Sequence, residues 1–398
     1  MISISNCSVC GGGLENALTV EVYPLLTSAC PPDAKVPLLP ILVGHCRCCS
    51  HVQLMERPTQ EQLDLIYLGE YTNVMEKGVL SSADQMHLDC KAFFDFADAG
   101  KLPADGKVLE IGCFDGSFLS LFEGRKLMGC EPNPMGRVAI ERYGVDVVPQ
   151  YFSAADFKKS SIDLVIMRHL IEHLQEPLEV LEDCWKIIKP GGRLLIETPN
   201  IEHTLTQHVV GNFYHQHLHY FSRESLPLVL RRAGFEIVGH GIMDFRQFVV
   251  ATKVDRPRNV FNDSRAPYGI MIRSHIENFC RYLETLQLDI TAWLAKNPGR
   301  IAIYGASSTA TGIVYAGGLP PGRLAYLIDA DPRKHGNLLP GTDCEVFSPE
   351  HLRADPVETV FIASDFFKDE IKALLKTQFS DVVKHCIISH PNLVVETL

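Results

Sequence analysis

The chain has 398 residues, which is enough for two or three domains of roughly 150 residues each. Apolar residues make up 46% and charged residues 21%, close to a globular average, so the composition argues against a disordered chain or a coiled coil. The net charge of −11 disfavours a nucleic-acid partner, because binding to phosphates needs clustered lysine and arginine. No apolar run approaches the roughly 18 residues of a membrane span, so we expect no membrane partner. A small molecule fits this composition better.

Cysteine usage indicates a reducing environment. The chain holds 13 cysteines, an odd number, and its first residues show no basic segment followed by an apolar one, so we expect a cytoplasmic protein without a secretory signal. Two CxxC pairs stand apart from the rest, Cys7 with Cys10 and Cys46 with Cys49. Four thiolates in two such pairs suit a tetrahedral structural Zn²⁺. Cys48 lies inside the second pair, but the spacing favours Cys46 and Cys49.

The predicted elements divide the chain into three parts. Residues 1–85 read as an irregular zinc-binding module with a proline-rich middle and a short strand near 51–54. Metal binding would stabilise such a segment by on the order of 10 kcal/mol. Residues 86–255 begin with a helix near 86–99, and from residue 107 strands alternate with helices near 119–124, 135–143 and 177–188. This alternation predicts a doubly wound parallel α/β sheet.

The third part, residues 256–398, begins with a polar linker and a long helix ending near residue 294. From residue 300 a second strand–helix alternation predicts a smaller Rossmann-like domain. Its stretch GASSTATG, from Gly305 to Gly312, is not a dinucleotide fingerprint. Asp329 ends the next strand, where a ribose-binding acid would sit. Structural support is the favoured role of this domain, and a residual nucleotide or sugar contact is the alternative.

The turn VLEIGCFDGSF indicates the cofactor. Gly112 lets a ligand approach the backbone, Gly116 opens the next segment, and Phe114 replaces the middle glycine that a pyrophosphate would need. Glu110 and Glu131 place two carboxylates around one pocket. Carboxylates repel phosphates but accept hydrogen bonds from ribose hydroxyls, and they tolerate sulfonium and ammonium groups.

These features match S-adenosylmethionine, which carries no phosphate. Ligands of such sheets bind beyond the carboxyl ends of the strands. The predicted cofactor residues therefore lie just after strands, and beyond the turn and Glu131 they are Asp156, for the adenine amino group, with Arg168 and His169. An ordinary solvated loop acid is the alternative for each carboxylate taken alone.

In its motifs and their order, the whole chain resembles three-domain sugar methyltransferases of natural-product and polysaccharide pathways, similar to deoxysugar C-methyltransferases. The resemblance is carried by the segments CSVC, CRCC, EIGCFDGSFL, RHLIEHLQEPL, YHQHLHYFS, YGASSTATG and KHGNLLPGT. It implies a central class I methyltransferase domain, S-adenosylmethionine as methyl donor, a structural zinc remote from the chemistry, and a nucleotide-linked sugar as acceptor. Methylation of a carbon next to a ketone is the implied reaction.

The resemblance also implies roles for the histidine-rich segment. His217 matches the proposed base that removes a proton alpha to the ketone, Tyr214 would orient the substrate, and His173 would stabilise the enolate oxygen. Tyr71 matches a tyrosine of the sugar pocket only loosely, and His215 is a second substrate candidate. If the segment is extended, three imidazoles at alternate positions point to one side. The third is His219, for which we favour a packing role.

Gln216 departs from the family pattern, which has glutamate there. An amide cannot stabilise an imidazolium or act as a carboxylate base. Transfer to oxygen or nitrogen of another small metabolite therefore stays open, as does a non-catalytic scaffold that binds S-adenosylmethionine. His169 and His173 lie four residues apart, and a metal pair on one helix face is a weaker alternative. The acceptor, the methylated atom and the oligomeric state do not follow from the sequence.

Overall fold

The computed structural model describes the chain except residues 68–92, 96–101, 104, 256–265 and 365–366. It forms two compact units. The first comprises residues 1–15, 44–201 and 217–270, and the second comprises residues 16–43, 202–216 and 271–398. The predicted domain boundaries at 85/86 and 255/256 stay predictions, because both lie at residues outside the described part.

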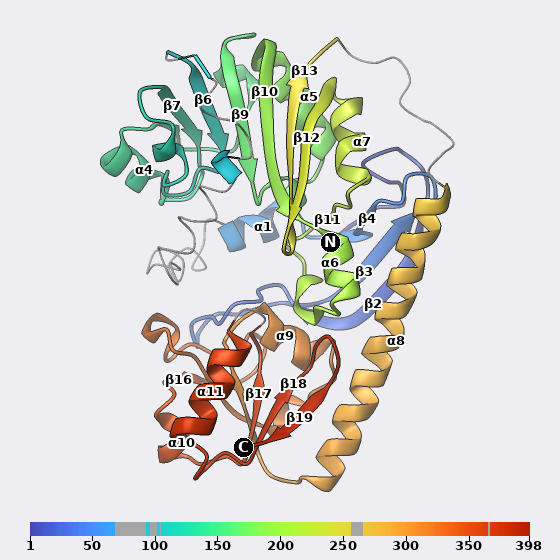
Figure 1. Cartoon of the computed structure of the whole chain (residues 1–398), viewed down its shortest axis with the longest axis vertical. Helices are drawn as coiled ribbons and strands as arrows, with labels where there is room; N and C mark the ends of the chain where they lie inside the picture. The colour runs from blue at the N-terminus through green and yellow to red at the C-terminus, as the bar shows by residue number, and fades with distance from the viewer. Residues whose placement is uncertain (68–92, 96–101, 104, 256–265, 365–366) are drawn as a thin grey trace. The chain divides into compact units, whose positions relative to one another are not determined.

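A seven-stranded sheet forms the centre of the first unit, with the strand order β12-β13-β10-β9-β6-β7-β8 (Figure 1). The sheet is parallel except that β13 runs antiparallel to both β10 and β12. Its strands are β6 (Lys107–Ile111), β7 (Lys126–Cys130), β8 (Asp146–Val148), β9 (Ile162–Arg168), β10 (Ile188–Pro199), β12 (Phe235–Met243) and β13 (Arg246–Lys253). The predicted doubly wound α/β sheet is confirmed.

Apolar side chains cover both faces of this sheet. Val108 and Leu164 belong to one buried cluster, whereas their neighbours Leu109 and Val165 belong to another. Successive strand residues point to opposite faces, so unbroken apolar strands need cover on both sides. The helices of this unit are α1 (Gln60–Tyr67), α4 (Gly136–Tyr143), α5 (Pro177–Ile187) and α7 (Ser225–Arg232). The described part of this unit also contains the 3₁₀ turns η2 (Leu119–Leu121), η3 (Ala154–Asp156) and η4 (Ile171–His173).

Three local predictions need correction. The helix expected near 119–124 is only the turn η2, and it is followed by Gly124 in the left-handed region with a φ of 75°. The supposedly irregular N-terminal segment contains two long strands, β2 (Leu14–Pro24) and β3 (Leu38–Cys46). They belong to a four-stranded sheet, β11-β4-β3-β2, with β4 (Val52–Leu54) and β11 (His219–Tyr220), whereas β1 (Ile2–Ser3) pairs with β5 (Glu56–Arg57). The helix expected near 86–99 lies mostly outside the described residues.

The third correction concerns the histidine-rich segment. His215 and Gln216 form a turn, and only His219 and Tyr220 are in a strand. Without an extended backbone the alternating side chains need not point to one side, and the imidazoles find separate partners. His219 Nδ1 lies 3.0 Å from His51 Nε2, whereas the ring of His217 packs against His173.

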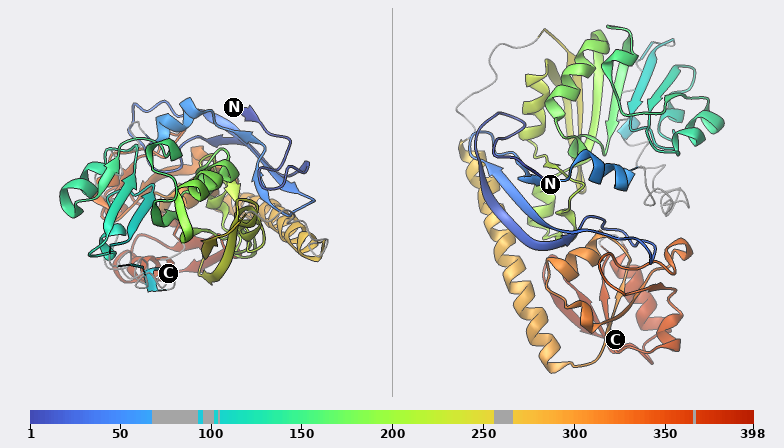
Figure 2. Two further views of the ribbon diagram at one scale, coloured as in Figure 1. Left: turned by 90° about the horizontal axis from the view of Figure 1, so that it is seen from above. Right: turned by 180° about the vertical axis from the view of Figure 1, so that it is seen from behind.

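The second unit contains a six-stranded sheet in the order β16-β15-β14-β17-β18-β19. Only β19 is antiparallel to its neighbour, so the predicted Rossmann-like sheet is confirmed. The strands are β14 (Ile301–Tyr304), β15 (Leu324–Ile328), β16 (Val346–Phe347), β17 (Thr359–Ile362), β18 (His385–Ile388) and β19 (Val394–Thr397). The helices are α6 (Ile201–Thr206), α8 (Ala266–Lys296), α9 (Ser308–Tyr315), α10 (His351–Ala354) and α11 (Lys368–Gln378), with 3₁₀ turns η5 (Val210–Asn212), η7 (Pro321–Arg323) and η8 (Pro332–Lys334). Figure 2 shows α8, in orange, as one continuous helix.

Among the described residues, no helix is both long enough and apolar enough to cross a membrane.

Candidate active site

Two buried carboxylates lie at the carboxyl edge of the first sheet, where the parallel strands β7 and β9 flank β6 on its two sides. Glu131, 8% exposed, follows β7 and accepts hydrogen bonds from the main-chain N–H groups of Phe114 (2.8 Å) and Asn133 (2.9 Å). Glu110 lies on β6, is 3% exposed, and its Oε2 has no hydrogen-bond partner. Burial raises the pKa of Glu110 to about 8, against the opposing charge of Arg168. An unpaired buried carboxylate oxygen calls for a ligand that donates hydrogen bonds or carries positive charge.

The glycines and Phe114 shape this edge. Gly112 has a φ of 73° and Phe114 one of 48°, so the turn uses left-handed backbone at both positions. A Cβ at Gly116 would lie 2.7 Å from the Cβ of Ala139 on α4, so this glycine allows close packing of the turn against that helix. The acceptors present fit an adenosine cofactor without phosphate, because two buried acids, Glu110 and Glu131, lie beside the turn.

Three other predicted cofactor residues have protein partners. Arg168 Nε donates to Glu197 Oε2 at 2.7 Å, and its guanidinium lies 4.4 Å from the centre of the Phe118 ring. His169 is exposed and lies 3.5 Å from a carboxylate oxygen of Glu197. Asp156 is also exposed and accepts from the Gln150 amide at 2.8 Å. Their cofactor roles stay predictions.

A cluster of two histidines and a glutamate lies beside this edge. Glu172, His173 and His217 each offer an atom, and the three atoms lie within 4.8 Å of one another. The His173 and His217 rings meet edge to face, with centroids 4.9 Å apart. Burial, together with the charge of His173 and against the opposing charge of Glu172, lowers the pKa of His217 to about 3. His217 is therefore a neutral imidazole, able to accept a proton.

Tyr67, the last residue of α1, connects the cluster with the carboxylate edge. Its hydroxyl lies 3.0 Å from His173 Nδ1, and its main-chain oxygen accepts from the Asn133 side chain at 3.2 Å. The loop that carries Glu131 and the pair of histidines thus share one bridging residue. The sequence analysis missed Tyr67 and considered Tyr71 instead, which lies outside the described residues.

The remaining predicted substrate residues belong to the second unit. Both ring nitrogens of buried His215 lie near main-chain oxygens, those of Pro24 at 3.3 Å and Pro40 at 3.2 Å. These contacts indicate a packing role for His215. Gln216 is 6% exposed and Tyr214 is half-buried. Their catalytic roles stay predictions.

The four predicted metal ligands converge. Their Sγ atoms all lie within 4.8 Å of one another, with Cys7 to Cys49 at 3.5 Å and Cys10 to Cys46 at 3.4 Å. Tetrahedral Zn²⁺ with bonds of about 2.3 Å holds sulfurs about 3.8 Å apart, so the quartet fits this ion. Cys48 is exposed and outside the quartet.

Within the first unit, hydrogen bonds connect the segment that follows Cys49 with the segment around His217, called the base segment below. The Leu54 N–H donates to the Leu218 carbonyl at 2.9 Å, next to His217. Fully buried Arg57 donates to the Gln175 carbonyl (2.6 Å) and the Ser8 hydroxyl (3.0 Å). The fold of the cysteine module therefore helps to place the residues around His217.

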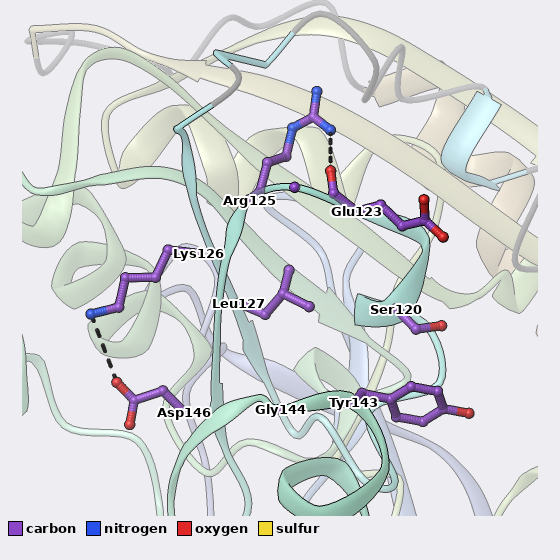
Figure 3. A pocket seen from close by; sticks show the side chains of 9 residues that line it. Ser120, Glu123, Arg125, Lys126, Leu127, Tyr143, Gly144 and Asp146 are labelled. Atoms are coloured by element: carbon purple, nitrogen blue, oxygen red, sulfur yellow. Dashed lines mark hydrogen bonds and ion pairs between the residues drawn. The ribbon is translucent and has the colours of Figure 1, made fainter.

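One open depression of about 650 Å³ lies elsewhere (Figure 3). Its lining includes Glu123, Arg125, Lys126 and Asp146, near the amino end of β7. Glu131 follows the other end of that strand. Because ligands of doubly wound sheets bind at the carboxyl ends, this depression is not the cofactor site.

Comparison with known families agrees with this geometry. A family described as "Methyltransferase domain" matches residues 83–240, and one described as "C-methyltransferase C-terminal domain" matches residues 268–388. The chain is thus an S-adenosylmethionine-dependent methyltransferase, and its pair of domains supports a place among C-methyltransferases.

A particular relative is C-methyltransferase NovU of Streptomyces niveus, 25% identical over 264 residues, or 61% of this chain and 62% of the relative. The ubiquinone biosynthesis O-methyltransferase of Pectobacterium atrosepticum is 33% identical over 103 residues, 24% of this chain and 43% of that protein. The matches thus span less than two thirds of these relatives.

Two crystal structures share part of the fold. The 1,6-didemethyltoxoflavin-N1-methyltransferase of Burkholderia thailandensis covers 52% of this chain and 96% of its own, with 15% identity and a TM-score of 0.39. An S-adenosylmethionine-dependent methyltransferase of Aquifex aeolicus covers 46% and 98%, with 18% identity and a TM-score of 0.37. Neither likeness bears on the substrate.

Proposed function

We propose that the chain transfers a methyl group from S-adenosylmethionine to a carbon next to the ketone of a nucleotide-linked sugar, with His217 as general base. The observation that carries this proposal is the neutral, buried imidazole of His217, packed on His173 and linked through Tyr67 to the loop of Glu131. A carbon acid needs such a base, and an oxygen or nitrogen nucleophile has less need of one. The similarity to a C-methyltransferase also supports carbon as the methylated atom.

Each side chain has a distinct task in this reaction. S-adenosylmethionine supplies an electrophilic methyl carbon when bound. Glu131 accepts the ribose hydroxyls, and Glu110, once ionised, attracts the positive end of the cofactor. His217 takes the carbon-bound proton, and His173, held by Tyr67, donates a hydrogen bond to the developing enolate oxygen. Burial of the imidazoles excludes water, which strengthens these interactions.

We also propose that Cys7, Cys10, Cys46 and Cys49 hold one structural Zn²⁺. Support comes from the convergence of their sulfurs and from the absence of an open ligand position among four thiolates. The ion would stabilise the module that pairs, through Leu54, with the base segment.

Methyl-¹³C-labelled S-adenosylmethionine and a panel of nucleoside diphosphate-linked ketohexoses test the proposed reaction. Carbon-, oxygen- and nitrogen-bound methyl groups differ in their ¹³C chemical shifts. We expect a carbon-bound methyl signal in the sugar product. An oxygen- or nitrogen-bound signal would refute carbon methylation, and binding of the methyl donor without turnover of any acceptor would favour a scaffold.

A further inference from the structure

The proposed base needs a negative group near it. Proton transfer turns neutral His217 into an imidazolium, and a buried cation is costly unless an anion lies close by. Its neighbour in the chain, Gln216, carries no charge. The question is which side chain of the described residues fills that role.

Glu172 is placed to do so. It lies in η4, is 1% exposed, and its Oε2 accepts from the Thr198 hydroxyl at 2.9 Å. Its Oε1 makes no hydrogen bond and lies 3.9 Å from His173 Nε2, within the cluster that contains His217. The Leu218 N–H donates to the Glu172 main-chain oxygen at 2.8 Å. The backbone of the base segment is therefore held directly on the backbone of Glu172.

The charges around the cluster keep Glu172 ionised. Burial raises its pKa, but the neighbouring imidazoles, led by His169 at 3.6 Å, lower it to about 2. His169 lies between Glu172, at 3.6 Å, and Glu197, at 3.5 Å, and Glu197 also pairs with Arg168 and Arg246. These two carboxylates raise the pKa of the exposed His169 side chain to about 9.

Two further rings among the described residues face His217. His173 meets its ring on one side, and the aromatic ring of Tyr220 lies 6.1 Å away on another. The Tyr67 hydroxyl contacts His173. Within the described part of the chain, the charge of Glu172 favours protonation of His217, whereas the charges of His173 and His169 oppose it.

On the basis of the proposed function, we propose that Glu172 is the positioning carboxylate of the base and stabilises protonated His217 in place of the anion that Gln216 cannot supply. The carbon-bound proton moves to a nitrogen of His217. The electron pair of the broken C–H bond shifts towards the ketone oxygen and then forms the bond to the methyl carbon. The pair of the sulfur–methyl bond stays on sulfur, and Glu172 remains ionised throughout.

Glu172→Gln removes the charge and retains the shape of the side chain. The main-chain bond to Leu218 is unaffected. With a nucleoside diphosphate-linked ketohexose bearing deuterium on the carbons next to the ketone, we expect kcat to fall about 10- to 100-fold, a range set by the usual contribution of base catalysis. The primary deuterium isotope effect on kcat rises because deprotonation becomes slower than the other steps. KM and the affinity for S-adenosylhomocysteine stay within about twofold, since binding is unaffected.

Glu176→Gln is the matched control, because it makes the same substitution four residues later in the sequence, at an exposed position immediately before α5. We expect wild-type kcat there. Glu172→Asp, which keeps the charge, should recover part of kcat and also serves if Glu172→Gln does not fold. A wild-type kcat and isotope effect in folded Glu172→Gln, or a Glu172→Asp enzyme no better than His217→Ala, would overturn the inference.

Elemental analysis tests whether Glu172, His173 and His217 bind a metal ion instead. We expect one zinc per chain in the wild type and in Glu172→Gln. A second metal ion that is lost in Glu172→Gln would make the cluster a metal site and would also overturn the inference. Failure of the proposed function is recognised separately, because then His217→Ala would keep full turnover whatever Glu172 does.

Discussion

Replacement of Glu131 by glutamine tests the cofactor edge. The carboxylate accepts two main-chain N–H groups, from Phe114 at 2.8 Å and Asn133 at 2.9 Å. Glutamine has one acceptor oxygen, so one of these groups would face an NH₂ instead, which costs about 1–3 kcal/mol of folding stability. Loss of one charge-assisted bond to a ribose hydroxyl costs a further ~1.5–3 kcal/mol of binding free energy, or about 10- to 150-fold in affinity.

Isothermal titration of S-adenosylhomocysteine measures this loss, and thermal unfolding without ligand measures the effect on stability. Glu123→Gln is the control, since Glu123 is exposed and precedes the opposite end of β7. It should bind S-adenosylhomocysteine as the wild type does. If Glu131→Gln bound within twofold of the wild type, the assignment of Glu131 to the ribose would be wrong.

Three further predictions concern the edge, the module and the second unit. The pKa of Glu110 is raised from 4.5 to about 8, so wild-type stability falls as the pH rises between these values. Glu110→Gln should therefore melt higher than the wild type at pH 9, by about 2 °C or more. The gap should narrow towards pH 4.5, and a pH-independent gap would contradict the assignment. Cys46→Ser should lose zinc by elemental analysis and Cys48→Ser should keep it; equal zinc in both would exclude the quartet. A Cβ at Gly211 would lie 2.6 Å from the Thr309 backbone, so Gly211→Ala should lose about 1–3 kcal/mol in urea unfolding, and unchanged stability would refute that close packing.

Elements with strong local patterns were predictable from the sequence. Strand β6 is mostly buried and is followed by Gly112, and α4 is followed by Gly144 in the left-handed region with a φ of 65°. Strands β2 and β3 were missed, because the prolines and cysteines around them suggested an irregular module and strand pairing is not local. The turn η2 was expected to be longer because its apolar residues resemble a helix face.

In the candidate site, too, residues with a local sequence pattern were predictable and residues that depend on long-range contacts were not. The cysteine quartet and the two edge carboxylates follow from spacing and from strand ends. Glu172 was visible in the motif IEHL, but its importance depends on the main-chain bond to Leu218, 46 residues away in sequence, and on the contact with Thr198. Such long-range contacts leave no periodic signal. Tyr67 was missed for the same reason, because its relation to His173 exists only in the folded chain.

Exchange of the substrate's alpha proton tests the central claim most directly. The enzyme is incubated in D₂O with S-adenosylhomocysteine and the nucleoside diphosphate-linked ketohexose that it methylates, and ¹H NMR follows the proton on the methylated carbon. We predict that the wild type exchanges this proton and that His217→Ala does not, although it still binds S-adenosylhomocysteine. Equal exchange by His217→Ala and the wild type would contradict the role of His217 as the base.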